Sequence, residues 1–356
     1  MTQTMKAVRL FEYGGPEVLR YDDYPMPQVG PFDVLVRVLA SSVSRWDITQ
    51  RDGRIRNRLP GRPGFALPMQ QGRDAAGVVE AIGSEVRAFK PGDRVVGLVH
   101  PANPLSVLAI RGLGNLSTQI EYPGHTMFGG NAQFVARPES YWLPLPPTVE
   151  PAEAAAAMWS YATSHRVLVD RLGSRLGDSI LVVGGSGGMG SATLDLARAM
   201  GVRVIAVTRS ADKADFLQSC GAAAVVVLSG QNDAEAVRAL APELGLDGAV
   251  EYSGAPAMQR LCIDVLRPGG TVVIVANDTL GNPLPLTAAD CLRLEINLKG
   301  VRGSTLDDQR TVLELLAQRR IHPAIHTVMP LSDIQNAHRC LDGGGVLGRI
   351  VLDPWK

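Results

Sequence analysis

The sequence lacks several features that mark whole classes of protein. Its four cysteines are far apart and form no C-x-x-C pair, so Cys220, Cys262, Cys291 and Cys340 are expected to be small buried residues. Basic and acidic residues both number 35, which gives no overall field to attract nucleic acid or an anionic membrane. No apolar run approaches the roughly 20 residues that span a bilayer, and the first residues lack the apolar region of a secretory signal. A soluble, cytoplasmic protein is expected.

The chain of 356 residues is long enough for two domains. Residues 1–150 predict short strands broken by turns, beginning with two strands around a Gly-Gly-Pro turn in KAVRLFEYGGPEVLRYDDYP. From Pro151 a helix is followed by apolar strands that alternate with helices, which predicts a doubly wound parallel sheet over residues 151–304. Residues 305–356 predict two helices and a last strand that complete the first domain.

A glycine-rich loop follows the strand SILVV and leads directly into a helix. Gly185, Gly187 and Gly190 satisfy G-x-G-x-x-G, in which the glycines permit the turn, the approach of a pyrophosphate and close packing of helix on strand. The position at the first strand–helix junction of an alternating region makes this pattern specific for a dinucleotide. The predicted loop contacts are Gly185, Ser186, Gly187, Gly188, Met189 and Gly190.

The end of the second strand predicts which dinucleotide binds. An NAD site of this type carries an acidic residue there for the ribose 2′-hydroxyl, but VRVIAV ends in Thr208-Arg209-Ser210, followed by Lys213. Hydroxyls and cations would hold a 2′-phosphate by charge-assisted hydrogen bonds, so NADPH is the predicted cofactor. Later strand ends add Ser253, Gly254, Ala276 and Asn277 as expected cofactor contacts, and Arg349 is assigned to the cofactor phosphates or the nicotinamide side.

These segments together resemble the medium-chain dehydrogenase/reductase superfamily. The resemblance rests on GRDAAGVVEAIGSEVRAFKPGDRVVG, FGGNAQFV, ATSHRVLV, GGSGGMG, GGTVVIVAN and LGRIVL, in that order along nearly the whole chain. It implies a GroES-like, β-rich catalytic domain built from residues 1–150 and 305–356, with a Rossmann domain over 151–304. It also implies a homodimer or homotetramer through the segment LEINLKGVRG.

The sequence departs from the zinc alcohol dehydrogenases of that superfamily at every matching ligand position. The expected cysteine is Ser44, the histidine of G-H-E is Arg73, and the third ligand falls near Trp159. Hydroxyl, guanidinium and indole cannot replace thiolate and imidazole, so no metal is expected. The segment that replaces the structural zinc lobe is flanked by His100 and His125, which are expected to be loop residues. Asp74 is then free to pair with Arg73, unless Arg73 faces the substrate as a fixed cation.

What remains resembles the zinc-free branch of quinone oxidoreductases and enoyl reductases, in particular the reductase half of crotonyl-CoA carboxylase/reductases. The resemblance implies hydride transfer from NADPH to an alkene conjugated to a carbonyl, with the enolate oxygen held by hydrogen bonds. Thr163 matches a helix threonine near the nicotinamide. Ser44, Arg73, Tyr161 and His165 are the candidate catalytic residues.

Three alternatives stay open from the sequence. The same cofactor could reduce C=O or C=N bonds, as in an alcohol dehydrogenase-like enzyme, or the chain could bind NADPH without turnover. The segment RWDITQRDGRIRNRLPGRPG carries six arginines and two aspartates, a net charge of +4. Such a basic loop could hold the phosphates of a CoA thioester or another anionic substrate, or it could be an ordinary solvated surface.

Overall fold

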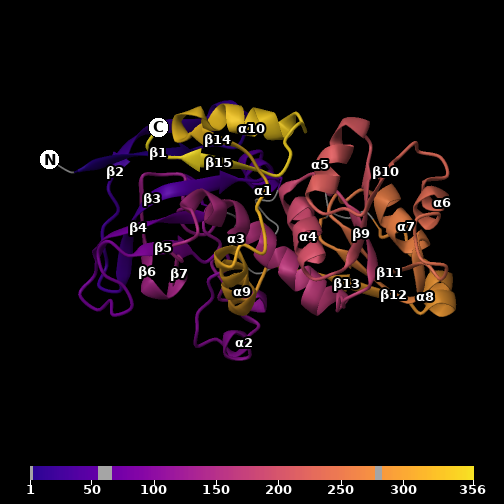
Figure 1. The fold of residues 1–356 in the computed structure, drawn as a ribbon. Coiled ribbons are helices and arrows are strands. Elements are labelled where there is room, and N and C mark those ends of the chain that lie inside the picture. The colour runs from indigo at the N-terminus through magenta and orange to yellow at the C-terminus, as the bar shows by residue number, and fades with distance from the viewer. Residues whose placement is uncertain (1–2, 55–65, 277–282) are drawn as a thin grey trace. The chain divides into compact units, whose positions relative to one another are not determined.

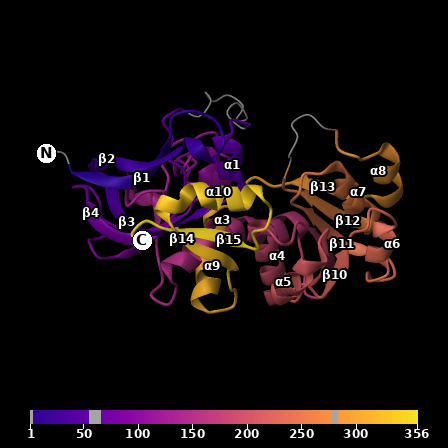
Figure 2. The ribbon, with the colours of Figure 1, turned by 90° about the horizontal axis from the view of Figure 1, so that it is seen from above.

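The computed structural model describes residues 3–54, 66–276 and 283–356. The chain divides into two compact units. The first unit contains residues 1–159, 304–319 and 325–356, and the second contains residues 160–303 and 320–324. Both chain ends belong to the first unit, as the colours of Figures 1 and 2 show. The functional domain boundaries at 150/151 and 304/305 stay a prediction.

The first unit is built on a seven-stranded, mostly antiparallel sheet. Its order is β14-β15-β3-β4-β5-β7, and β6 also pairs with β3. The long strand β3 is the centre, because it pairs with β4, β6 and β15. The strands are β3 (Asp33–Val43), β4 (Ala75–Ile82), β5 (Arg94–Gly97), β6 (Phe134–Pro138), β7 (Trp142–Pro144), β14 (Ile325–Pro330) and β15 (Arg349–Asp353).

A separate hairpin and several helices complete the first unit. The hairpin strands β1 (Thr4–Leu10) and β2 (Leu19–Pro25) pair antiparallel around the predicted Gly-Gly-Pro turn. Helix α10 (Ile334–Asp342) packs its buried Ile334 and Ala337 against the apolar core formed by β1 and β15, beside which Figure 1 shows it. The other helices are α1 (Arg45–Arg51), α2 (Val107–Ile110) and α9 (Leu306–Ala317).

Helix α3 (Pro151–Arg166) begins at a proline, as predicted, and runs into a π-helical segment over Val167–Leu172. Its alanine run is completely buried, and Ala155 and Ala156 pack against Ala40 of β3 and Val351 of β15. Side chains this small let the helix approach the sheet closely. The run at residues 154–157 therefore forms a packing face of the helix.

The second unit is a parallel six-stranded sheet with the order β10-β9-β8-β11-β12-β13. This is the doubly wound order of dinucleotide-binding domains, in which the chain reverses direction across the sheet after its third strand. The strands are β8 (Ser179–Val183), β9 (Arg203–Thr208), β10 (Ala224–Val227), β11 (Leu246–Glu251), β12 (Leu266–Ile274) and β13 (Asn297–Gly300). The predicted doubly wound sheet is confirmed.

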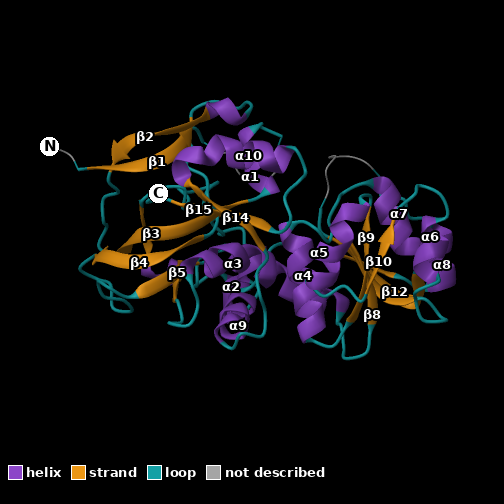
Figure 3. Ribbon diagram, turned by 45° about the horizontal axis from the view of Figure 1, so that its top comes forward, coloured by secondary structure: helices purple, strands orange, loops and turns teal. Residues whose placement is uncertain are grey.

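Helices cover both faces of this sheet. Figures 1 and 3 show α4 (Gly188–Ala199) and α5 (Ala214–Ser219) on one face, with α6 (Asp233–Arg238), α7 (Pro256–Asp264) and α8 (Ala288–Leu294) on the other. Val237 of α6 and Leu261 of α7 enter the core formed by alternate apolar residues of the strands, such as Leu181 and Ile205. None of the described helices is both long and apolar enough to cross a membrane.

Some expectations about individual segments were wrong. The arginine-rich segment does not begin as a loop, because residues 45–51 form α1, where the Asp47 carboxylate accepts hydrogen bonds from Ser44 at the helix start. Strand β14 was not foreseen. Of the four free cysteines only Cys262 is fully buried, whereas Cys291 and Cys340 are exposed on the solvent faces of α8 and α10.

Candidate functional site

The strand ends of the second unit bring most of the predicted cofactor residues to one edge. Val183 at the end of β8 is in register with Val207 of β9 and with Glu251 of β11, and Glu251 is in register with Ile274 of β12. Because these strands are parallel, the loops that follow them emerge side by side. The edge carries the glycine loop 184–190, the turn 208–210, Ser253, Gly254 and Ala276; Asn277 lies outside the described residues.

The glycines of the loop have two different physical roles. A Cβ on Gly190 would lie 2.2 Å from the carbonyl oxygen of Gly184, so Gly190 is required for α4 to pack against the loop. A Cβ on Gly187 would meet no described atom closer than 3.8 Å. Gly187 is exposed and caps α4, whose first N–H groups have no partner within the helix and whose dipole favours an anion. The open space at Gly187 therefore fits the pyrophosphate of a dinucleotide.

A cluster of hydroxyl groups, which the sequence did not indicate, binds the backbone of this loop. Ser164 of α3 and Thr193 of α4 both donate to the carbonyl oxygen of Met189, at 3.1 and 3.0 Å. The phenol of Tyr252 lies 2.6 Å from the Thr193 hydroxyl. Nearby on α3, the hydroxyl of Thr163 is buried and has no hydrogen-bond partner among the described residues, so it can serve a bound group.

The segment after β9 carries Arg209 and Lys213, the two cations predicted to favour NADPH. Arg209 is exposed and Lys213 is partly exposed. The backbone N–H of Ser210 donates to the hydroxyl of Thr208 at 3.2 Å, which fixes the turn. The hydroxyl of Ser210 donates to Asp212, an acidic neighbour that the sequence analysis did not weigh.

Two predicted catalytic residues lie in the second unit, on α3. The ring of His165 is partly exposed. The hydroxyl of Tyr161 lies 2.9 Å from Asp195 and 3.0 Å from the carbonyl oxygen of His322. Burial, together with Asp195, raises the pKa of Tyr161 well above its ordinary value. This phenol anchors the segment 320–324, and its role in proton transfer stays a prediction.

In the first unit, Arg73 lies in a cage of aromatic rings. Its guanidinium carbon is 4.4 Å from the ring centre of Trp159, 5.1 Å from that of Tyr122 and 5.8 Å from that of Trp46. Burial lowers the pKa of Arg73 to about 10, so the group is still cationic at neutral pH. Nη1 lies 3.2 Å from Nε2 of His100, whereas Nε and Nη2 find no hydrogen-bond partner among the described residues.

The two histidines expected in loops do lie in loops, and both are buried beside this cage. Because arginine only donates, His100 accepts at Nε2, and its Nδ1 lies 3.3 Å from the hydroxyl of Ser304. His125 accepts a hydrogen bond at Nδ1 from the indole of Trp46 at 3.1 Å, and burial lowers its pKa well below the ordinary value. Among the described residues, no three His, Cys, Asp or Glu side chains are grouped so that they could hold a metal ion.

Asp74 pairs with Arg349 rather than with Arg73. Its fully buried carboxylate accepts from Nη2 of Arg349 at 2.7 Å, from the hydroxyl of Ser42 at 2.7 Å and from the backbone N–H of Trp159 at 2.9 Å. Of the two sequence alternatives for Arg73, the pairing with Asp74 is therefore wrong. Arg349 is used within the first unit, and its assignment to the cofactor stays a prediction.

Ser44 and the arginines of the basic segment are also engaged locally. The Ser44 hydroxyl donates to Asp47 at 2.6 Å, which leaves it only as an acceptor for other groups. Arg51 is buried against His338 and Asp342, and Arg54 pairs with Asp52. The later arginines of the segment lie outside the described residues.

Comparisons with known proteins agree with these two units. Residues 30–147 match the alcohol dehydrogenase GroES-like domain, and residues 188–318 match the zinc-binding dehydrogenase family. A quinone oxidoreductase of Mus musculus is 30% identical over 98% of this chain and 97% of its own. The chain belongs to the medium-chain dehydrogenase/reductase superfamily. It is therefore an oxidoreductase of a superfamily that uses a nicotinamide cofactor.

The names of other relatives indicate different reactions and cofactors. A crotonyl-CoA reductase of Streptomyces avermitilis is 31% identical over 94% of this chain and 82% of its own. A solved NAD-dependent alcohol dehydrogenase is 30% identical, with a TM-score of 0.89 over 98% of this chain and 99% of its own. A putative zinc-binding dehydrogenase of Sinorhizobium meliloti bound to NADP is 26% identical, with a TM-score of 0.88 over 99% of this chain and all of its own.

Proposed function

We propose that this protein is a zinc-independent, NADPH-dependent reductase that adds hydride to an activated C=C bond of a quinone, an enone or an enoyl thioester. The observation that carries the proposal is the caged guanidinium of Arg73. At two positions that resemble those of zinc ligands the chain holds Ser44 and Arg73, the third position falls near Trp159, and Arg73 lies over the ring of Trp159. A buried cation at this place repels a metal ion and offers hydrogen-bond donors instead.

Arg73 has the chemistry to bind the oxygen of a conjugated carbonyl. The guanidinium is planar, and its Nε and Nη2 are the donors without partners among the described residues. When hydride adds to the β-carbon of such a substrate, negative charge develops on the carbonyl oxygen. A fixed cation in a buried, aromatic cage stabilises this charge more than it stabilises the neutral substrate, which is the condition for catalysis.

Several residues of the second unit fit a nicotinamide cofactor, which supplies the hydride when bound. The open space at Gly187 and the N-terminus of α4 suit the pyrophosphate. Arg209, exposed at the end of β9, suits a 2′-phosphate, and this supports NADPH over NADH. The unpartnered hydroxyl of Thr163 suits the polar edge of the nicotinamide, as its resemblance to the family threonine implies.

The function is tested by NADPH oxidation with a quinone, a cyclic enone, crotonyl-CoA and an aldehyde, together with the zinc content of the purified protein. We expect turnover of at least one conjugated substrate and no loss after chelation. Turnover of the aldehyde alone would identify a carbonyl reductase. Binding of NADPH, seen by its fluorescence, without consumption of any substrate would identify a protein that binds the cofactor without turnover.

The role of Arg73 is tested by Arg73→Met, with Arg137→Met as the matched control. Both arginines are fully buried beside indole rings, and burial lowers both pKa values to about 10. Loss of one oxyanion donor costs roughly 10²–10³ in rate, so Arg73→Met should lower kcat by about 100-fold with unchanged binding of NADPH. Arg137→Met should stay within about threefold. Equal losses in the two variants would show that the cage is only structural.

A further inference from the structure

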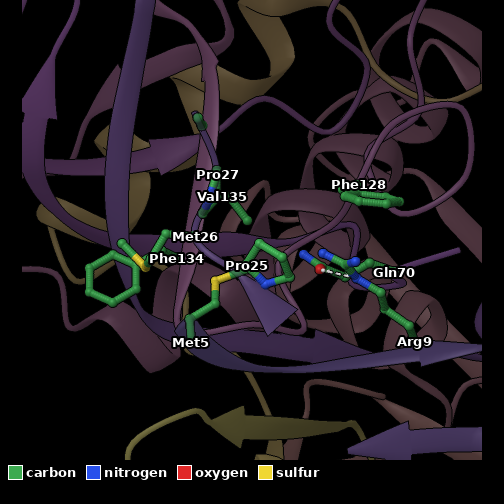
Figure 4. Close-up of a pocket in the computed structure, with 10 residues that line it drawn as sticks. Met5, Arg9, Pro25, Met26, Pro27, Gln70, Phe128, Phe134 and Val135 are labelled. Atoms are coloured by element: carbon green, nitrogen blue, oxygen red, sulfur yellow. Dashed lines mark hydrogen bonds between the residues drawn. The ribbon is translucent and has the colours of Figure 1, made fainter. Parts of the chain in front are cut away.

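The first unit contains a pocket that shares no residue with the Arg73 cage or with the cofactor edge. It has a volume of about 250 Å³ and lies between the β1–β2 hairpin, strand β6 and the residues just before Arg73 in sequence. Figure 4 shows its lining side chains, with Arg9, Gln70 and Phe128 at one end and the apolar side chains at the other. The volume is close to the lower limit of roughly 300 Å³ for small-molecule sites.

The charged end of this pocket is Arg9, held between two aromatic rings. Its guanidinium carbon lies 4.2 Å from the ring centre of Tyr24 and 4.5 Å from that of Phe128. The five N–H groups of a guanidinium lie in its plane and form a rigid fork of donors, which matches the two oxygens of a carboxylate. Among the described residues, only Nε of Arg9 is engaged, in a long hydrogen bond of 3.4 Å to Gln70. The geometry fixes the fork of Arg9 before any ligand arrives.

No carboxylate neutralises Arg9 among the residues that the structure describes. Burial lowers the pKa of Arg9, and the nearby phenol of Tyr24 acts in the opposite direction. By contrast, Arg20, which is its partner across the hairpin, lies 3.7 Å from Glu12. A half-buried cation without a counter-ion attracts an anion more strongly than a solvated one does, because its charge is less screened.

The rest of the pocket is apolar. Met5, Pro25 and Met26 form one wall and Phe134 closes the far end, as Figure 4 shows. Arg9 is the only charged residue among the ten that line the pocket. One cation suits a ligand with one negative charge, and the walls favour an apolar body, since burial of apolar surface stabilises the bound state.

We propose that this pocket binds a small monocarboxylate with an apolar body, with the carboxylate on the fork of Arg9 and the body against Met5, Met26 and Phe134. The site is separate from the proposed reduction, so it does not depend on the proposed function. A bidentate contact with the carboxylate gives orientation as well as affinity, and the methionines adapt to bodies of different shape.

The proposal is tested on the full chain with 2-naphthoate as the probe and 2-naphthamide as its uncharged analogue, by calorimetry. We expect saturable binding of 2-naphthoate below a Kd of about 1 mM, a tenfold weaker amide, and at least tenfold weaker naphthoate binding in Arg9→Gln. Arg37→Gln is the matched control, because Arg37 also lies over an aromatic ring, the indole of Trp355, but lines no part of this pocket. Its Kd should be unchanged, as should that of Arg73→Met.

If Arg9→Gln does not fold, Arg9→Lys and methyl labelling test the proposed carboxylate site instead. Lysine keeps the charge but not the fork, so its Kd should rise about threefold to tenfold. In the wild type with ¹³C-methyl methionine, the signals of Met5 and Met26 should shift on addition of 2-naphthoate. Equal affinity for acid and amide, absence of saturation at about 1 mM, unshifted Met5 and Met26 signals, or equal loss in Arg73→Met would each overturn the proposal.

Discussion

The carboxylate of Asp74 accepts a hydrogen bond from Arg349 at 2.7 Å, while the neighbouring Arg73 stacks on Trp159. Two arginines near one acid thus have different surroundings. Arg349 lies in a compensated ion pair that joins β15 to the segment before β4. Arg73 keeps two donors without a partner among the described residues. Asp74 therefore has a structural role, whereas the adjacent Arg73 has the proposed catalytic role. Single substitutions can test the two roles separately.

Asp74→Asn should destabilise the protein strongly. The substitution leaves the buried charge of Arg349 without its counter-ion, and breaking a buried pair in this way costs about 3–5 kcal/mol. Asp23→Asn is the control, since the Lys6–Asp23 pair at 2.8 Å is largely exposed and should contribute little to stability. The free energies of unfolding in urea measure both. A loss below about 1 kcal/mol in Asp74→Asn would contradict the assigned pairing.

The sequence predicted the fold well where the signal was local. The structure confirms three features that local residue patterns predict. They are the glycine loop at a strand–helix junction, the apolar strands of residues 179–274 and the helix that begins at Pro151. Strand β14 escaped notice because its burial pattern does not alternate and Pro330 ends it. Helix α1 was mistaken for a loop, because its charged residues are typical of a surface loop. The capping interaction between Ser44 and Asp47, which starts the helix, was not recognised.

The Arg73 cage could not be foreseen in the same way. Its walls, Trp46, Tyr122 and Trp159, come from segments more than 30 residues apart, and no spacing rule joins them. The sequence correctly marked Arg73 as unusual, because it stands where a ligand residue was expected. It offered no means to choose between Asp74 and the aromatic rings as the surroundings of Arg73, because that choice depends on the position of Arg349.

Gly187→Ala and Gly190→Ala should separate cofactor binding from folding. Alanine at position 190 places its Cβ 2.2 Å from a backbone oxygen, so Gly190→Ala should lower the melting temperature markedly. Alanine at position 187 meets open space within the chain, so Gly187→Ala should fold like the wild type but bind the cofactor at least tenfold more weakly. Melting curves and titration of NADPH fluorescence measure the two effects. Unchanged NADPH affinity in folded Gly187→Ala would place the pyrophosphate elsewhere.

Arg209→Ala should change the choice of cofactor. A hydrogen bond to a charged group contributes about 1.5–3 kcal/mol, so loss of Arg209 should raise the KM for NADPH by roughly 10- to 100-fold. The KM for NADH should stay within about twofold. Arg203→Ala is the control, since Arg203 is exposed at the opposite end of the same strand. If both KM values rise equally in Arg209→Ala, the arginine does not recognise the 2′-phosphate.

His338→Asn should remove part of the acid sensitivity of the protein. His338 is fully buried, its Nδ1 accepts from Arg51 at 3.2 Å, and Arg51 also pairs with Asp342. Burial lowers the pKa of His338 to about 3. Between that value and the unfolded pKa of about 6.5, only the unfolded chain binds the proton, so stability falls as the pH falls.

The expected loss for this one group is about 2 kcal/mol between pH 7 and pH 5, at roughly 1.4 kcal/mol for each pH unit below 6.5. Asparagine can still accept from Arg51 but does not titrate, so His338→Asn should lose about 2 kcal/mol less than the wild type over the same interval. His326→Asn is the matched control for the replacement of a histidine, because His326 is exposed on β14. Urea unfolding at the two pH values measures the difference, and an identical loss in wild type and His338→Asn would show that the buried imidazole becomes protonated in the folded protein.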